Sequence, residues 1–295
     1  MPSGDFDRSM MWRALGLARR GCGSTRPNPM VGAVVVSNGE IVGSGYHQFA
    51  GGPHGEVNAL DAAGDKARGA TLYVVLEPCN HFGRTPPCTE RILRSGVSRV
   101  VWAIDDPNPD VSGNGGLRLR DAGIETCSGV LQSEASELNA LWLHSIQHKK
   151  PYLLLKLACS SDNKIARADG SSQWISSEVA RAQVHRLRRQ YDAILVGART
   201  VLQDDPRLSN RSGRGQNPLR IVVDSKLRVS PRAQMFSKLP SDPSHTAASG
   251  RVNAMLVTSA SVPDERRAEF EAAGIEILSA GKSSRVDLSL LLAEL

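Results

Sequence analysis

The amino-acid sequence predicts an α/β protein with two domains. Its 295 residues exceed the usual size of a single domain. In both halves, short apolar runs alternate with segments of helical periodicity, a pattern typical of sheets covered by helices. The polar segment from His148 to Pro151 interrupts this alternation. We therefore expect one domain over residues 1–147 and a second over residues 148–295.

The first half opens with a helix and a hairpin. Met11, Leu15 and Ala18 have helical spacing and predict a helix over 7–21. Residues 31–47 predict a β-hairpin that turns at Asn38-Gly39, because this pair accepts the positive φ angles of a tight turn. The pattern then predicts strands over 71–77, 98–105 and 124–130, a loop followed by a helix over 51–67, and helices over 89–96, 117–123 and 132–146.

The second half shows the same alternation. It predicts strands over 151–160, 192–197, 219–225, 252–260 and 275–281, and helices over 176–190, 266–274 and 288–295. Flexible Gly/Ser/Pro segments lie between some of these elements.

Composition and cysteine usage exclude several classes of protein. No apolar run approaches the roughly 20 residues needed to cross a membrane, and the N-terminus lacks the pattern of a signal peptide. The 5 cysteines are an odd number, which argues against a disulfide framework and favours free thiols in a reducing compartment. We therefore expect a cytoplasmic protein with no membrane partner.

Charge is distributed unevenly along the chain, although the total is only +6. Residues 145–232 hold 17 Lys+Arg and 7 Asp+Glu, a net of +10, whereas 1–144 and 233–295 each carry a net of −2. This balance indicates an anionic partner for the second domain, either a nucleic acid, a phosphorylated substrate or a phosphate-rich cofactor. A solvated basic face would give the same balance.

Four residues of the first half have the types and order of a catalytic zinc site. His54 and Glu56 begin a predicted helix. Cys79 follows Pro78 after a strand, and Cys88 begins another helix. This order matches the H-x-E…P-C…C pattern of zinc deaminases, with eight residues between the cysteines in place of the usual two. Imidazole and thiolate suit Zn²⁺, and three ligands leave a fourth position for water. We predict His54, Cys79 and Cys88 as the ligands.

Glu56 is the predicted catalytic residue of this site. Zinc lowers the pKa of bound water toward neutrality. Because Glu56 lies two residues from His54, its carboxylate is placed to take the water proton and pass it to a leaving amine.

Longer strings surround these motifs. The first half contains PNPMVGAVVV, GYHQFAGGPHGEVNAL, LEPCNHFGRTPPCTERI and DPNPDVSGNGG. The second half contains PYLLLKLACSSDNKIA, SSQWISSEVAR, DAILVGARTVLQDDPRL and LRIVVDS. With these strings the chain resembles the bifunctional riboflavin biosynthesis family, a pyrimidine deaminase fused to a reductase. The resemblance implies a cytidine-deaminase-like α/β/α sandwich with a mixed sheet, followed by a dihydrofolate-reductase-like α/β domain.

The resemblance also implies ligands and contacts. The deaminase would remove the C2 amino group of 2,5-diamino-6-ribosylamino-4(3H)-pyrimidinone 5′-phosphate, and the reductase would use NADPH on the resulting 5-amino-6-(5-phosphoribosylamino)uracil. The implied deaminase substrate contacts are Asn28, His47, Arg84, Thr85, Asp106 and Asn108. The implied reductase contacts are Ser172, Arg188, Leu208 and Arg211 for the substrate, and Trp174, Thr200, Asp204 and Ser225 for the cofactor.

The second half departs from the family in two ways. The usual S-L-D-G reads Ser160-Ser161-Asp162-Asn163, and the sequence stops at Leu295 where the family continues with a strand, a Glu-Gly-Gly-type cofactor loop and further elements. We therefore expect an incomplete, truncated reductase-like domain with weak or lost reductase activity.

Two other functions remain open from the residues alone. The zinc pattern and the basic middle of the chain would also suit a nucleic-acid-editing deaminase, although aromatic residues make up only 4% and stacking platforms are scarce. A non-catalytic, zinc-stabilised scaffold would use the same ligands. We expect a small phosphorylated pyrimidine as partner, no nucleic acid, and a homo-oligomer, which the family forms.

Overall fold

The computed structural model describes residues 4–83, 86–108, 114–240, 242 and 252–295. The chain forms two compact units, Met1–Tyr152 and Leu153–Leu295. The boundary expected after residue 147 stays a prediction. No helix in the described ranges is long and apolar enough to cross a membrane.

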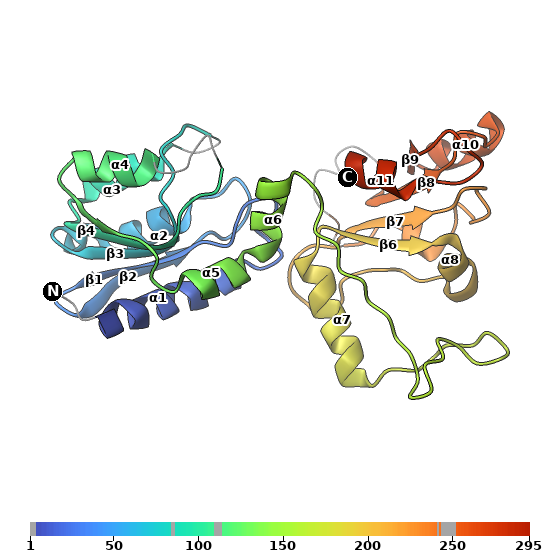
Figure 1. Ribbon diagram of the computed structural model, residues 1–295, viewed down its shortest axis with the longest axis horizontal. Helices are drawn as coiled ribbons and strands as arrows, with labels where there is room; N and C mark the ends of the chain where they lie inside the picture. Colours follow the sequence, from blue (N-terminus) through green and yellow to red (C-terminus); the bar gives the residue numbers. More distant parts are fainter. Residues whose placement is uncertain (1–3, 84–85, 109–113, 241, 243–251) are drawn as a thin grey trace. The chain divides into compact units, whose positions relative to one another are not determined.

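The first unit is built on a five-stranded mixed sheet with the order β2-β1-β3-β4-β5. β1 runs antiparallel to β2 and β3, while β3, β4 and β5 run parallel. Helices α1 and α5 lie on one face of the sheet and α2, α3 and α4 lie on the other (Figure 1). The α/β/α sandwich with a mixed sheet is confirmed.

The elements of the first unit are α1 (Gly4–Ala18), a 3-10 turn (Arg19–Gly21), β1 (Gly32–Ser37), β2 (Glu40–Tyr46), α2 (Gly55–Ala63), a 3-10 turn (Gly64–Ala67), β3 (Thr71–Leu76), α3 (Cys88–Ser95), β4 (Arg99–Ile104), α4 (Asn114–Asp121), β5 (Glu125–Cys127), α5 (Gln132–Leu138) and α6 (Ala140–His148).

The hairpin forms where the sequence predicts it. Asn38 and Gly39 have φ angles of 51° and 81°, as the tight turn between β1 and β2 requires. On β2, a Cβ added to Gly43 would lie 2.3 Å from the carbonyl oxygen of Ala59 on α2. The bare glycine therefore lets α2 pack directly on the strand.

The last helix expected in the first unit forms two shorter helices in the structure. The segment expected to be helical over 132–146 breaks at Asn139, between α5 and α6. The Asn139 side chain accepts a hydrogen bond from the Met30 amide at 2.8 Å and donates one to the Met30 carbonyl at 3.1 Å. Asn139 thus ties the α5–α6 junction to the segment that precedes β1.

The second unit contains a parallel four-stranded sheet with the order β6-β7-β8-β9. One face packs against α8 and α10 around Val222, Leu256 and Phe270, and the other packs against α11 around Ile221, Val257 and Leu291. The elements are α7 (Glu178–Gln190), β6 (Ala193–Gly197), α8 (Ala198–Asp204), β7 (Leu219–Val223), a 3-10 turn (Gln234–Phe236), β8 (Ala254–Thr258), α10 (Asp264–Ala272), β9 (Glu276–Ser279) and α11 (Leu288–Glu294).

The strand predicted over 151–160 is wrong for this structure. The segment has no strand pairing among the described residues, and Leu155 and Leu157 are 83% and 72% exposed. An apolar run can favour extended backbone, but a strand also needs a neighbouring backbone to take its hydrogen bonds. The periodicity of the run carries no information about that neighbour.

Candidate functional site

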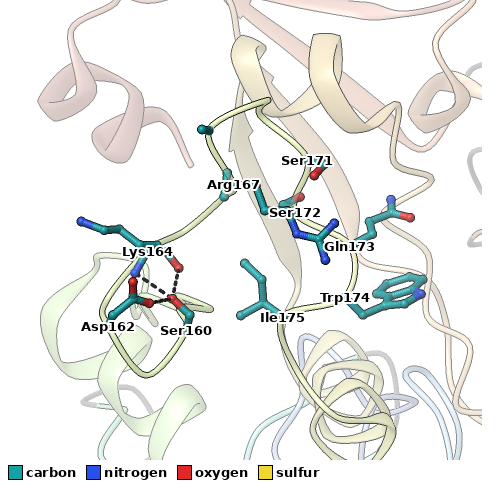
Figure 2. A pocket seen from close by; sticks show the side chains of 11 residues that line it. Ser160, Asp162, Lys164, Arg167, Ser171, Ser172, Gln173, Trp174 and Ile175 are labelled. Carbon is teal, nitrogen blue, oxygen red and sulfur yellow. Dashed lines mark hydrogen bonds between the residues drawn. The ribbon is translucent and has the colours of Figure 1, made fainter.

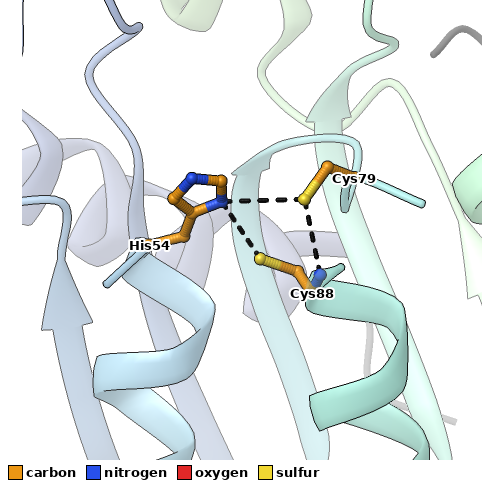
Figure 3. Close-up of side chains that lie close together, drawn as sticks. All are labelled: His54, Cys79 and Cys88. Atoms are coloured by element: carbon orange, nitrogen blue, oxygen red, sulfur yellow. Dashed lines mark hydrogen bonds between the residues drawn. The ribbon is translucent and has the colours of Figure 1, made fainter. Parts of the chain in front are cut away.

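Three side chains from distant parts of the first unit converge at one end of its sheet. His54 immediately precedes α2, Cys79 follows β3, and Cys88 is the first residue of α3. The Nδ1 atom of His54 lies 3.1 Å from the Cys88 sulfur and 3.7 Å from the Cys79 sulfur, and all three atoms lie within 4.8 Å of one another. Figure 3 shows Nδ1 facing both sulfurs.

This cluster fits a zinc ion. With tetrahedral angles and bonds of about 2.0–2.3 Å, zinc ligand atoms lie about 3.5–3.8 Å apart. The separation between His54 and the Cys79 sulfur, 3.7 Å, lies in this range, and the separation between His54 and the Cys88 sulfur, 3.1 Å, is shorter. The backbone N–H of Cys88, at the start of α3, points to the Cys79 sulfur at 3.4 Å. The hydrogen bond from the Cys88 thiol lowers the pKa of Cys79, which favours the thiolate that a metal needs. Zinc is therefore the metal that the donor set suits.

Glu56 is buried beside this cluster. Its side chain is only 3% exposed, and its Oε2 atom has no hydrogen-bond partner among the described residues. Burial raises the pKa of Glu56 to about 7, against the opposing effect of the nearby His54 charge. A buried carboxyl oxygen without a partner is costly in a purely structural role, so Glu56 is poised to exchange a proton with a ligand.

Asn28 and His47 lie next to the cluster. The Asn28 amide nitrogen is 3.1 Å from His47 Nε2, and His47 Nδ1 is 3.0 Å from the carbonyl oxygen of Pro53, the residue before His54. The rings of His47 and His54 meet edge to face with centroids 5.4 Å apart. This chain of contacts fixes the His47 ring and presents Asn28 beside it.

Asp106 and Asn108 follow the end of β4. Glu77, which the sequence analysis did not single out, positions this segment. The buried Glu77 accepts hydrogen bonds from the amide of Gly116 at 2.9 Å and from the amide of Asp106 at 3.3 Å. Asp106 in turn accepts from the Asn108 amide at 2.9 Å. Glu77 thereby holds the segment after β4 and the start of α4 against the Cys79 loop. The charged residue before Pro78, at the end of an otherwise apolar strand, was the available signal.

Arg84 and Thr85, also expected to contact the substrate, lie outside the described residues. Their expected roles stay predictions.

In the second unit, Ser172 and Trp174 line an open pocket of about 670 Å³ (Figure 2). The guanidinium of Arg181 lies 4.4 Å from the centre of the Trp174 ring. Another wall comes from the turn that departs from the family sequence, where Asn163 has a φ of 61°. Asparagine tolerates this left-handed conformation better than most residues, so it can replace the usual glycine there.

Arg188, Leu208 and Arg211 come together on a separate part of this unit. Arg188 of α7 donates from Nη1 to the Ser209 carbonyl at 3.0 Å, and its buried Nε has no partner among the described residues. The Arg211 amide donates to His185 on α7 at 3.3 Å. Burial and the charge of Arg211 lower the pKa of Arg188. Two neighbouring guanidinium groups of this kind suit a phosphate.

Thr200, Asp204 and Ser225 lie at the carboxyl edge of the parallel sheet. Thr200 and Asp204 are on α8, which follows β6 directly, and Ser225 is two residues beyond β7. Open α/β sheets commonly bind ligands at this edge. Within the described part of the chain, no hydrogen bond, ion pair or ring contact joins Trp174 to any of these three residues.

Comparisons with known proteins agree with this division of the chain. Residues 5–104 match the cytidine and deoxycytidylate deaminase zinc-binding region, and residues 151–295 match the RibD C-terminal domain. The second match gives no support to the expectation that the reductase domain is truncated.

Relatives that match most or all of the chain carry the name of one family. The riboflavin biosynthesis protein RibD of Actinobacillus pleuropneumoniae is 42% identical over 100% of this chain and 77% of its own length. That of Aquifex aeolicus is 52% identical over 79% of this chain and 66% of its own length. The matched part of the chain thus spans about two thirds of some curated relatives.

Solved structures give the same result. Acinetobacter baumannii RibD is similar with a TM-score of 0.86 and 36% identity, over 99% of this chain and 77% of that one. A Thermotoga maritima diaminohydroxyphosphoribosylaminopyrimidine deaminase/5-amino-6-(5-phosphoribosylamino)uracil reductase has a TM-score of 0.79 and 38% identity, over 94% and 81%. The chain therefore belongs to the RibD family of riboflavin biosynthesis proteins, which joins a zinc-binding deaminase domain to a reductase domain.

Proposed function

We propose that this chain deaminates 2,5-diamino-6-ribosylamino-4(3H)-pyrimidinone 5′-phosphate in riboflavin biosynthesis. One water is consumed, the C2 amino group leaves as ammonia, and oxygen takes its place. The observation that carries the proposal is the buried carboxyl of Glu56, with an unpartnered oxygen, beside the converging ligand atoms of His54, Cys79 and Cys88. Membership of the RibD family supports this reading over a nucleic-acid-editing deaminase and over a scaffold.

His54, Cys79 and Cys88 are the proposed zinc ligands, and a bound zinc ion would supply an activated water at its fourth position. Glu56 would take the proton of that water and deliver it to the departing amine, because its buried Oε2 has no hydrogen-bond partner among the described residues. The fixed ring of His47 and the amide of Asn28 would orient the pyrimidine by hydrogen bonds. Asp106, held by Glu77, and Asn108 would contact the ribose phosphate, together with Arg84 and Thr85.

We propose reduction of the deaminated ribotide by NADPH as the second activity. The supporting observation is the pair Arg188 and Arg211, which would hold the ribotide phosphate, with Leu208 and Ser172 as further proposed substrate contacts. The cofactor would use the carboxyl edge of the parallel sheet at Thr200, Asp204 and Ser225, with Trp174 as a further contact. We place both activities in a cytoplasmic homo-oligomer, following the free cysteines and the family resemblance.

The decisive test replaces Glu56 in the zinc-loaded protein. Mass spectrometry would follow the diaminopyrimidinone ribotide with and without NADPH, and zinc content would be measured in parallel. Glu56→Gln should lower the deamination rate by about 10²–10⁴-fold while zinc content and thermal stability stay near those of the parent. Glu90→Gln, on the exposed side of α3 where it pairs with Arg118 at 3.4 Å, is the matched control and should be unaffected.

Each outcome of this test is informative. Deamination that survives Glu56→Gln would overturn the assignment of the proton carrier. A parent protein that leaves the ribotide unchanged would overturn the proposed substrate. Deamination without the ribityl product when NADPH is present would overturn the second activity alone.

A further inference from the structure

The loop between the two cysteine ligands of the first unit is long. Eight residues lie between Cys79 and Cys88, where zinc deaminases usually have two. Because a longer loop can adopt more conformations, eight residues restrict the separation of their ends less than two do. The middle of the loop is exposed at His81, Phe82 and Gly83, and Phe82 is 82% exposed. The separation of the two sulfurs therefore needs a support other than the loop itself.

The residues that directly follow the two cysteines supply such a support. The Thr89 hydroxyl donates a hydrogen bond of 2.7 Å to the side-chain oxygen of Asn80, the residue after Cys79. The Thr89 amide donates a second bond, of 3.2 Å, to the Cys79 carbonyl. These two bonds, which we call the clasp, close the loop at its ends and next to both ligands.

The side-chain bond is the part of the clasp that the sequence specifies. Any residue except proline could donate the amide bond from position 89. Thr89 is 0% exposed, and valine would fill the same space there without burying a hydroxyl. A threonine at this fully buried position is therefore explained by its hydrogen bond to Asn80.

The clasp aligns two segments that are otherwise anchored separately. Cys88 begins α3, which packs on the core through the fully buried Ile92, whereas Cys79 follows β3 of the sheet. The Cys88 amide points to the Cys79 sulfur at 3.4 Å, a contact that depends on the same alignment (Figure 3). The third ligand, His54, precedes α2, which takes no part in the clasp.

We propose that Asn80 and Thr89 are positioning residues that hold the Cys79 and Cys88 sulfurs at the separation zinc requires. The assignment rests on the proposed zinc site and extends it to the two residues that follow the cysteine ligands. Metal ligands need positions within about 0.2 Å of their preferred distances, so relaxation of the loop ends would weaken zinc binding. The hydroxyl of Thr89 thus acts on the metal through the thiolates and does not touch it.

The test measures zinc affinity by competition with a chromophoric chelator, together with thermal unfolding of the zinc-free protein. Thr89→Val keeps the shape of the side chain and removes its hydroxyl, so zinc affinity should fall at least about tenfold. Thr89→Ser retains a hydroxyl and should keep most of the parental affinity. Ser95→Ala is the matched control, because it removes from the same helix a hydroxyl that donates to the Ile92 carbonyl at 2.6 Å, and it should keep the parental affinity.

A second variant separates the clasp from the stability of α3. Asn80→Ala removes the acceptor, which lies outside the helix and is half-buried, so it also serves if Thr89→Val does not fold. If the two side chains act through one bond, Asn80→Ala/Thr89→Val should lose no more zinc affinity than either single variant. With Co²⁺ in place of zinc, the visible absorption that reports tetrahedral thiolate coordination should change alike in both single variants and stay parental in Ser95→Ala.

Three results would overturn the inference. The first is parental zinc affinity in Thr89→Val or in Asn80→Ala. The second is a double variant whose loss is the sum of the two single losses. The third is a Thr89→Ser variant as weak as Thr89→Val, which would show that the shape of the side chain matters and its hydroxyl does not. A parent that leaves the ribotide unchanged, with variants that lose zinc affinity as expected, would refute the proposed deamination and support the clasp.

Discussion

Gly115, the second residue of α4, packs against the backbone of Pro78, which directly precedes the proposed zinc ligand Cys79. A Cβ added there would lie 1.9 Å from the carbonyl oxygen of Pro78, the residue before the ligand Cys79. Ordinary carbon–oxygen contacts are about 3.3 Å. Gly115→Ala must therefore separate α4 from the Pro78-Cys79 segment by about 1.4 Å, and because both sides of the contact are backbone, no side chain can turn away to absorb it.

The expected result is weaker zinc binding together with lower stability. Metal ligands need positions within about 0.2 Å of their preferred distances, so a shift of the segment that carries Cys79 exceeds the tolerance of the site. At other metal sites, mutation of residues that hold the ligands in place lowers metal affinity about 10- to 100-fold, and we expect a similar fall in zinc affinity here. Overpacking should also lower the free energy of unfolding by about 1–3 kcal/mol.

The neighbouring glycine supplies the control. A Cβ on Gly116 would meet the Trp102 ring at 2.8 Å and not the backbone before Cys79. Gly116→Ala should therefore cost stability without a comparable loss of zinc affinity. Zinc affinity would be measured by competition with a chromophoric chelator, and stability by thermal unfolding. Parental zinc affinity in Gly115→Ala, or equal losses in both variants, would refute the link between α4 and the ligand.

Three further predictions concern stability. Asp7→Asn should cost about 3 kcal/mol in urea unfolding, because it breaks the buried pair in which Asp7 lies 2.9 Å from Arg99. Burial acts to raise the pKa of Asp7, but the hydrogen bonds from Arg99 outweigh it and hold the pKa below its ordinary 3.8. The difference between parent and variant should thus be full above pH 3.8 and shrink as the pH falls further; a difference that grew in acid would contradict this sign. Arg220→Met should also cost about 3 kcal/mol, since it leaves Asp242 without the guanidinium 3.0 Å away, and an unchanged urea midpoint would count against it. Gly39→Ala should cost about 1 kcal/mol because the residue has a φ of 81°, whereas an increase in melting temperature would show that the turn tolerates a side chain.

Local sequence signals predicted the parts of this protein that depend on local chemistry. Asn38-Gly39 specifies its own turn, and the order of His54, Cys79 and Cys88 specifies a metal through the types of donor atom alone. Two of the three ligands lie at helix starts: His54 directly precedes α2, and Cys88 is the first residue of α3.

The features that were missed depend on contacts between distant segments. Asn139 divides a helix because its side chain binds Met30, 109 residues away in the sequence. Glu77 holds the start of α4 through Gly116, 39 residues away. Nothing in the helical periodicity around Asn139, or in the apolar strand before Glu77, contains the identity of those partners. Segment 151–160 was predicted wrongly for the converse reason. Its apolar run favours extended backbone, but no described strand pairs with it.

Part of the uneven charge of the chain gains a physical explanation from the pair Arg188 and Arg211. The net +10 of residues 145–232 includes both of these arginines, which the fold brings close together. A face that only solvated the domain would gain nothing from burying Arg188 beside another cation, since burial and the neighbouring charge both disfavour its protonated form. Such a pair is stabilised when an anion binds to it, and the phosphate of the substrate proposed for this domain supplies that anion.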